Sequence, residues 1–174
     1  MNKIRLIITK DCPNSCPKCC NKKLDFNSIP IIKNYNCDEL IITGGEPLGR
    51  NILKTVSLLN YLKYVDTDSK RKIFVYTTDL FQFSEIIHLV DGITLTIHNN
   101  VDMKNFICWN EYEKLTMYHF NEIIKDKSLR LYIFKDVIIP ENLDLSDWDV
   151  RKNLEWNEDC PIPEDETLLR TKNI

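Results

Sequence analysis

A short cysteine-rich segment is the part of this sequence with the clearest capacity for chemistry. Within "CPNSCPKCC", Cys12, Cys16 and Cys19 follow a C-x3-C-x2-C pattern, and Cys20 is adjacent to the last of them. The chain's other cysteines are scattered: Cys37, Cys108 and Cys160. Thiolates bind zinc and iron–sulfur clusters with high affinity, so clustered cysteines indicate a metal centre.

The segment alone admits three kinds of metal centre. Structural zinc takes four tetrahedral ligands, usually from two separated pairs, and the chain has no second pair of cysteines or histidines at such spacing. A closed cluster of ferredoxin type needs a fourth cysteine; Cys160, followed by Pro161, is the candidate, although the local spacing differs from the ferredoxin pattern. The third interpretation is an iron–sulfur cluster held by three cysteines, with one iron left open.

A second motif, "TGGEP", ends a strand that we expect over residues 38–44. Gly44 and Gly45 let the backbone approach a ligand closely and leave N–H and C=O groups free for it. Glu46 supplies an anion suited to an ammonium group, and Pro47 fixes the direction of the chain after the turn. Taken alone, the motif could be an ordinary strand-to-helix turn. One βαβ unit after the cysteines, it would lie on the same carboxyl-end rim, where parallel α/β barrels bind ligands.

Short strand patterns alternate with helical patterns along the chain. Strands are predicted over 3–9, 38–44, 72–78, 92–98 and 129–136. Helices are predicted over 49–65, 83–90 and about 110–127. This alternation indicates an α/β protein with a parallel sheet and right-handed crossovers. A length of 174 residues fits one domain.

The alternation of side chains within the strands predicts the shape of the sheet. In the strand over 92–98, the apolar side chains share one face, and the other face carries Thr94, Thr96 and His98. A sheet covered by helices on both sides should be apolar on both. We therefore expect a partial (β/α)6 barrel of TIM type, with helices outside and a polar lumen inside. A doubly wound sheet is the alternative. Residues 1–139 would form the core, and the acidic residues 140–174 a C-terminal extension of the same domain, draped over one end.

Composition and charge exclude several other classes of protein. Hydrophobic residues make up 43% and charged residues 28% of the chain, and the net charge is −3. This balance gives no general attraction to nucleic acid or to a membrane surface. No apolar run reaches the roughly 20 residues of a membrane-spanning helix, and the N-terminal apolar run is too short for a signal peptide. We expect a cytoplasmic protein, in which the cysteines are thiols or metal ligands.

The two motifs together resemble the radical SAM superfamily. Cys12, Cys16 and Cys19 match the three cysteines that hold its [4Fe–4S] cluster, and Gly44-Gly45-Glu46-Pro47 matches its methionine-binding motif. The resemblance covers roughly residues 1–136 and implies a partial (β/α)6 barrel. The residue before the third cysteine is commonly aromatic in the family and packs near adenine. It is Lys18 here, which leaves open how adenine is held.

The resemblance implies an enzyme of oxidoreductase or lyase type. The amino and carboxylate groups of S-adenosyl-L-methionine would chelate the open iron, and one-electron reduction would yield methionine and a 5′-deoxyadenosyl radical that removes a hydrogen atom from substrate. An electron donor such as flavodoxin or ferredoxin is implied as partner. Further cofactor contacts are expected where family members place them: Thr78 near the adenosine, with Thr77 beside it, and Thr96 and His98 near the ribose and carboxylate. No catalytic side chain is assigned beyond the cluster ligands, and Cys20 is expected to be a buried or incidental thiol.

Several substrates remain open. Activating enzymes of glycyl-radical proteins, particularly of anaerobic ribonucleotide reductase, are similar in "CCNKK" and "TGGEPL", and we favour them slightly. Compact enzymes that rearrange small molecules, such as 7-carboxy-7-deazaguanine synthase, and single-domain peptide modifiers are alternatives. Residues 156–166 could close the barrel over substrate or form a solvated tail, with Cys160 as a possible thiol. Arg130 and Tyr132 share a strand face and could meet a carboxylate. A zinc- or cluster-binding interaction module is the non-enzyme alternative.

Overall fold

The computed structural model describes residues 2–14, 16–66, 70–116, 120–157, 159 and 161–172. Seven parallel strands form one open sheet in the order β6-β5-β4-β3-β2-β1-β7. The strands are β1 (Lys3–Thr9), β2 (Glu39–Gly44), β3 (Lys72–Thr77), β4 (Gly92–Ile97), β5 (Ser128–Phe134), β6 (Asp149–Leu154) and β7 (Glu166–Arg170). All five expected strands are confirmed to within two residues at either end, and so is the α/β class with its parallel sheet.

The helices follow the strands as expected, with one difference in extent. They are η1 (Cys20–Lys22), η2 (Gly49–Asn51), α1 (Ile52–Tyr64), α2 (Phe83–Ile86), η3 (Ile87–Leu89), α3 (Asn100–Thr116) and α4 (Phe120–Ile124). α3 begins ten residues earlier than expected. The reason is a side-chain cap: Asn99 Oδ1 accepts hydrogen bonds from the N–H groups of Val101 and Asp102, at 2.8 and 3.0 Å. This polar first turn conceals the start of the helix in the sequence.

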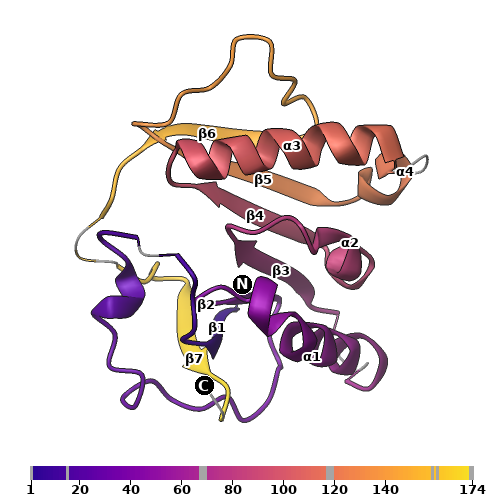
Figure 1. Ribbon diagram of the computed structural model, residues 1–174. Coiled ribbons are helices and arrows are strands. Elements are labelled where there is room, and N and C mark those ends of the chain that lie inside the picture. The colour runs from indigo at the N-terminus through magenta and orange to yellow at the C-terminus, as the bar shows by residue number, and fades with distance from the viewer. Residues whose placement is uncertain are drawn as a thin grey trace.

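The two faces of the sheet differ as the alternation predicted. Ile93, Leu95 and Ile97 of β4 belong to the main hydrophobic core, together with buried side chains of α1, α2 and α3. Helices therefore cover this face (Figure 1). Burying each such aliphatic side chain contributes about 1.5–3 kcal/mol. Thr96 and His98 lie on the opposite face and line a cavity described below. Within the part of the chain that the structure describes, the edge strands β6 and β7 do not pair with each other, so the sheet is open.

The C-terminal residues extend the sheet at both of its edges. β6 pairs with β5, and β7 pairs with β1, so residues 140–174 are not simply draped over one end. β6 is largely exposed and β7 is largely half-buried, and neither shows a clear hydrophobic alternation, so "DVRKNL" and "ETLLR" give a weak strand signal.

The connection between β6 and β7 has its course fixed by topology. Both strands run parallel to their neighbours but lie at opposite edges. The chain must therefore cross the whole sheet between Leu154 and Glu166 (Figure 1). We call residues 155–165 the connector. Across the described residues, no helix is long and apolar enough to cross a lipid bilayer.

Candidate functional site

The turn after β2 and the loop after β1 are bonded to each other through their backbones. β1 and β2 are adjacent and parallel, so their carboxyl ends meet at one rim of the sheet. The N–H of Gly45 donates to the carbonyl of Thr9, and the N–H of Glu46 donates to the carbonyl of Asp11, both at 2.8 Å. Asp11 directly precedes Cys12, so the GGEP turn fixes the start of the cysteine loop.

This contact explains why the turn has two glycines. Gly44 has a φ of 143°, which side-chain-bearing residues rarely adopt. A Cβ on Gly45 would lie 2.5 Å from the carbonyl carbon of Asp11 and 2.8 Å from the carbonyl oxygen of Lys10. We expected these glycines to leave backbone N–H groups free for a ligand. That expectation is wrong for Gly45, whose N–H group donates to the carbonyl of Thr9, and the N–H group of Glu46 is likewise occupied, by the carbonyl of Asp11.

Polar side chains hold the cysteine loop at further points. Asn21 Nδ2 donates to the carbonyl of Gly44, and Lys22 Nζ donates to the carbonyl of Cys16 at 2.8 Å. Asn51 Nδ2 donates to the carbonyl of Glu46 at 2.9 Å. These bonds connect the loop, the GGEP turn and the first turn before α1. Sequence reasoning did not identify Asn21 or Asn51, because a lone asparagine carries no spacing signal.

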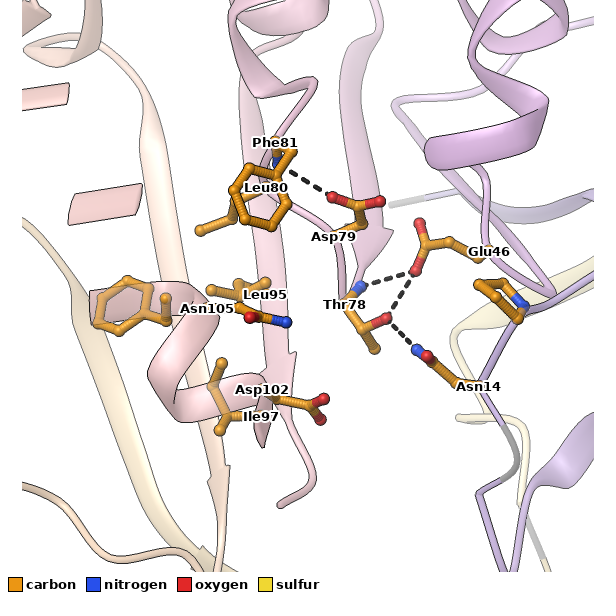
Figure 2. Close-up of a pocket in the computed structure, with 12 residues that line it drawn as sticks. Asn14, Glu46, Thr78, Asp79, Leu80, Phe81, Leu95, Ile97, Asp102 and Asn105 are labelled. Atoms are coloured by element: carbon orange, nitrogen blue, oxygen red, sulfur yellow. Dashed lines mark hydrogen bonds between the residues drawn. The ribbon is translucent and has the colours of Figure 1, made fainter. Parts of the chain in front are cut away.

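Glu46 lies at the centre of a buried hydrogen-bond network (Figure 2). Its side chain is 2% exposed, and its carboxylate accepts four hydrogen bonds. Oε1 accepts from the N–H of Leu48 at 3.0 Å and from the hydroxyl of Thr77. Oε2 accepts from the N–H and the hydroxyl of Thr78, both at 2.8 Å. Asn14 Nδ2, in the cysteine loop, donates to the same Thr78 hydroxyl at 2.5 Å.

This network gives Glu46 a different role from the one expected. A carboxylate offers about four acceptor sites, and the four donors fill them. An ammonium group could reach the carboxylate only by displacing one of these donors. Burial raises the pKa of Glu46, and the hydrogen bonds from Thr77, Thr78 and Leu48 oppose that rise. Glu46 joins the ends of β2 and β3 to the cysteine loop.

The predicted site residues meet at one cavity of about 480 Å³ on the polar face of the sheet. All of the expected metal- and cofactor-binding residues except Pro47 line it: Cys12, Cys16, Cys19, Gly44, Gly45, Glu46, Thr78, Thr96 and His98. Pro47 is buried instead, and its carbonyl accepts a hydrogen bond from the hydroxyl of Thr55 of α1. Arg5 and Tyr76 also line the cavity and were not identified in advance. Their place on the polar face could have been read from the strand alternation.

The three cysteines of the C-x3-C-x2-C pattern are free thiols. Burial, and to a smaller extent the neighbouring Cys19 and Cys12, raise the pKa of Cys16 to about 11. Burial likewise raises the pKa of Cys12. Thiolates are the metal-binding form, so metal uptake here must release protons. Within the described residues, no group of three or more His, Cys, Asp or Glu side chains could hold a single metal ion.

The other cysteines and Lys18 lie in different surroundings. Cys20 is exposed and disulfide-bonded, so it is not the buried or incidental thiol that we expected. Cys37 is a buried free thiol, and Cys108 is an exposed one. Lys18 is exposed and is not among the residues that line the cavity. Cys160 lies outside the described residues.

The connector closes one side of the cavity. Trp156 and Ile162 line it, opposite the end of β4. The Trp156 ring stacks on the His98 ring, with centroids 5.0 Å apart and planes 9° apart, and it also contacts Phe134 of β5 at 4.5 Å. Asp102 of α3 orients His98 in turn. Its Oδ2 accepts a hydrogen bond from the backbone N–H of His98 at 2.9 Å and lies 3.6 Å from Nδ1 of the His98 ring. Trp156 is half-buried and held by the His98 ring, so the solvated-tail interpretation is wrong for this residue, whereas Ile162 lines the cavity but is 43% exposed.

A second, smaller cavity has a volume of about 260 Å³, and Figure 2 shows residues that line it. Asn14, Glu46 and Thr78 line both cavities, so the hydrogen-bond network forms the wall between them. Leu95 and Ile97 place the smaller cavity on the helix-covered face.

Comparison with models of known protein families, with curated proteins and with solved structures found no match to this chain.

Proposed function

We propose that this chain is a radical SAM enzyme in which Cys12, Cys16 and Cys19 hold a [4Fe–4S] cluster. The observation that carries the proposal is that these three thiols and the first three residues of the GGEP turn line one cavity at the carboxyl-end rim. A cubane takes each thiolate at a different iron, so three thiols of one loop that line the same cavity suit it. Three ligands leave one iron for S-adenosylmethionine. When bound, this cofactor pair supplies a 5′-deoxyadenosyl radical that abstracts a hydrogen atom from substrate.

The chain's own residues have the tasks of positioning and enclosing. The backbone bonds from Gly45 and Glu46 hold the cysteine loop against β2, and the Glu46 carboxylate fixes it to β3 through Thr78. Thr96 and His98 offer polar groups to the adenosine half of the cofactor from the wall of the cavity. In this proposal the open sheet is a partial (β/α)6 barrel, to which β7 adds a strand beside β1.

The connector favours a small-molecule substrate over a large partner protein. A glycyl-radical protein would need to insert a backbone loop into the lumen. Trp156 and Ile162 line the cavity from the connector, and Trp156 stacks on His98, so in this proposal the connector takes space that such a loop would need. We therefore propose a substrate small enough to be enclosed, and we place the activating-enzyme interpretation second. A cytoplasmic electron donor such as flavodoxin or ferredoxin would supply the reducing equivalent.

Anaerobic reconstitution tests this proposal. The full chain, incubated with iron and sulfide, is expected to retain about four iron and four sulfide per chain. Addition of dithionite and S-adenosylmethionine should then yield 5′-deoxyadenosine and methionine. Cys12→Ala, Cys16→Ala and Cys19→Ala should each abolish this cleavage, whereas Cys108→Ala, a change at an exposed free thiol far along the chain, should not. Cys20→Ala should also leave cleavage in place. Tightly bound zinc with no cleavage product would overturn the proposal.

A further inference from the structure

A third cavity, of about 230 Å³, lies at the amino ends of the central strands. Ile73 near the start of β3, Asp91 just before β4 and Lys127 just before β5 all line it. The strands are parallel, so this end of the sheet is opposite the cysteine rim (Figure 1). β3 has six residues, which at about 3.3 Å per residue puts the cavity roughly 20 Å from that rim. It is therefore separate from the proposed reaction site.

Two ammonium groups meet in the wall of this cavity. Lys63 of α1 and Lys127 both line it. Lys63 Nζ donates to the carbonyl of His88, and Lys127 Nζ donates to the carbonyl of Val90 at 2.6 Å. The two carbonyls are two residues apart at the end of η3, so these bonds bring both ammonium groups to one place. An ammonium group has three N–H donors, and each bond uses one of them.

The positive charge in this cavity exceeds the negative charge. Arg71 and Asp66 also line it, but the Arg71 guanidinium donates to Asp66 Oδ2 at 2.7 Å, so these two charges neutralise each other. Asp91 is then the carboxylate that remains for the two lysines, and its Oδ2 accepts a backbone N–H at 2.7 Å. Among the described residues, neither lysine forms an ion pair; both donate to neutral carbonyls. Two ammonium groups and one carboxylate leave one positive charge in the cavity.

The two lysines also affect each other electrostatically. Burial lowers the pKa of Lys127, the nearby Asp91 opposes this effect, and the positive charge of Lys63 adds to the lowering. The ammonium groups are therefore close enough to repel each other, and an anion between them would relieve the repulsion. Lys63 is exposed and Lys127 is half-buried, so solvent and small ions have access to the cavity from the Lys63 side.

We propose that this cavity is a binding site for a phosphate group, held between the ammonium groups of Lys63 and Lys127. A tetrahedral phosphate presents oxygen atoms in several directions, so it can accept from two donors that approach from α1 and from the link between α4 and β5. A carboxylate has two oxygen atoms in one plane and suits such a pair less well. Lysine binds phosphate as a point charge and needs no forked geometry. The site lies outside the proposed reaction and does not depend on it.

Isothermal titration calorimetry of the full chain with inorganic phosphate tests this site, and acetate is the comparison anion. We expect phosphate to bind at least 10-fold more tightly than acetate. Lys63→Met and Lys127→Met should each weaken phosphate binding about 10-fold or more, because a charge-assisted hydrogen bond is lost. Lys125→Met is the matched control, since Lys125 is exposed, lies two residues from Lys127 and is not among the residues that line the cavity. It should leave the affinity unchanged.

A conservative variant separates binding from a merely structural role. Lys127→Arg keeps the cation and should retain phosphate binding within a few-fold of wild type, whereas Lys127→Met should lose it. If the lysines only cap the carbonyls at the end of η3, both Met variants will lower the melting temperature while phosphate binds none of the proteins, and the inference is overturned. Equal phosphate binding by wild type and both Met variants would also overturn it. Titration with glycerol phosphate then shows whether the bound group is free phosphate alone or also a phosphate ester.

Discussion

Replacing Gly45 with alanine should both destabilise the protein and displace the cysteine loop. The new Cβ would clash with the Asp11 carbonyl group, whose oxygen is nearest and whose carbon would lie 2.5 Å away, so a movement of at least about 0.9 Å is needed to restore ordinary contact near 3.4 Å. Such a movement stretches the 2.8 Å bond from Glu46 N–H to the Asp11 carbonyl to about 3.7 Å, which no longer counts as a hydrogen bond. The bond from Gly45 N–H to the Thr9 carbonyl should be strained as well.

Losing two partly buried backbone bonds should cost about 2–4 kcal/mol of the free energy of unfolding. For a chain of this length, that corresponds to a fall of roughly 4–16 °C in melting temperature. Because Cys12 follows Asp11 directly, we also expect iron retained after reconstitution and desalting to fall by at least half. Differential scanning calorimetry and iron determination measure the two effects.

Gly49→Ala is the matched control for this substitution. Gly49 also has a positive φ, of 59°, and a Cβ there would meet only the flexible Asp79 carboxylate, at 3.2 Å. It should cost about 1 kcal/mol through backbone strain and leave iron retention intact. If Gly45→Ala matches Gly49→Ala in both stability and iron content, the GGEP turn does not position the cysteine loop.

Two further substitutions test the side chains that surround the site. Thr78→Val keeps the shape of the side chain but removes the hydroxyl that joins the cysteine loop to the buried Glu46 carboxylate. It should lower the free energy of unfolding by about 1–3 kcal/mol and speed the loss of iron to a chelator. The control Thr167→Val, at an exposed site on β7, should do neither. Burial raises the pKa of Asp102, but the hydrogen bonds from His98 lower it by more, so the net effect is a lowered pKa. Ionised Asp102 therefore stabilises the fold above the ordinary carboxyl pKa of 3.8, and this stabilisation disappears as the pH falls through its lowered pKa. Urea unfolding of wild type and Asp102→Asn should differ by about 1 kcal/mol near pH 6 and converge in acid; a constant difference at all pH values would show that the charge is unimportant.

The sequence predicted the central strands and the difference between their faces, because both depend on local alternation. In β4, threonines alternate with isoleucine and leucine. The structure places the isoleucine and leucine side chains in the core and Thr96 on the opposite face, where it lines the cavity. The edge strands β6 and β7 were missed, because pairing with β5 and β1 is a long-range contact that leaves little hydrophobic pattern.

The candidate site was predictable in its members but not in their bonding. Spacing and strand ends brought the cysteines, the GGEP turn, Thr96 and His98 to one cavity. The sequence could not show that the N–H groups of Gly45 and Glu46 are occupied by the cysteine loop. It also could not show that Thr77 and Thr78 fill the acceptor sites of Glu46, since those threonines belong to another strand.

The proposed activity is tested most directly by measuring 5′-deoxyadenosine in an anaerobic mixture of reconstituted protein, dithionite and S-adenosylmethionine. We expect about four iron per chain and 5′-deoxyadenosine formed in amounts that rise with time and with protein. The Cys16→Ala variant should give neither. A chain that binds zinc, or that binds iron through residues other than Cys12, Cys16 and Cys19 and forms no 5′-deoxyadenosine, would contradict the account.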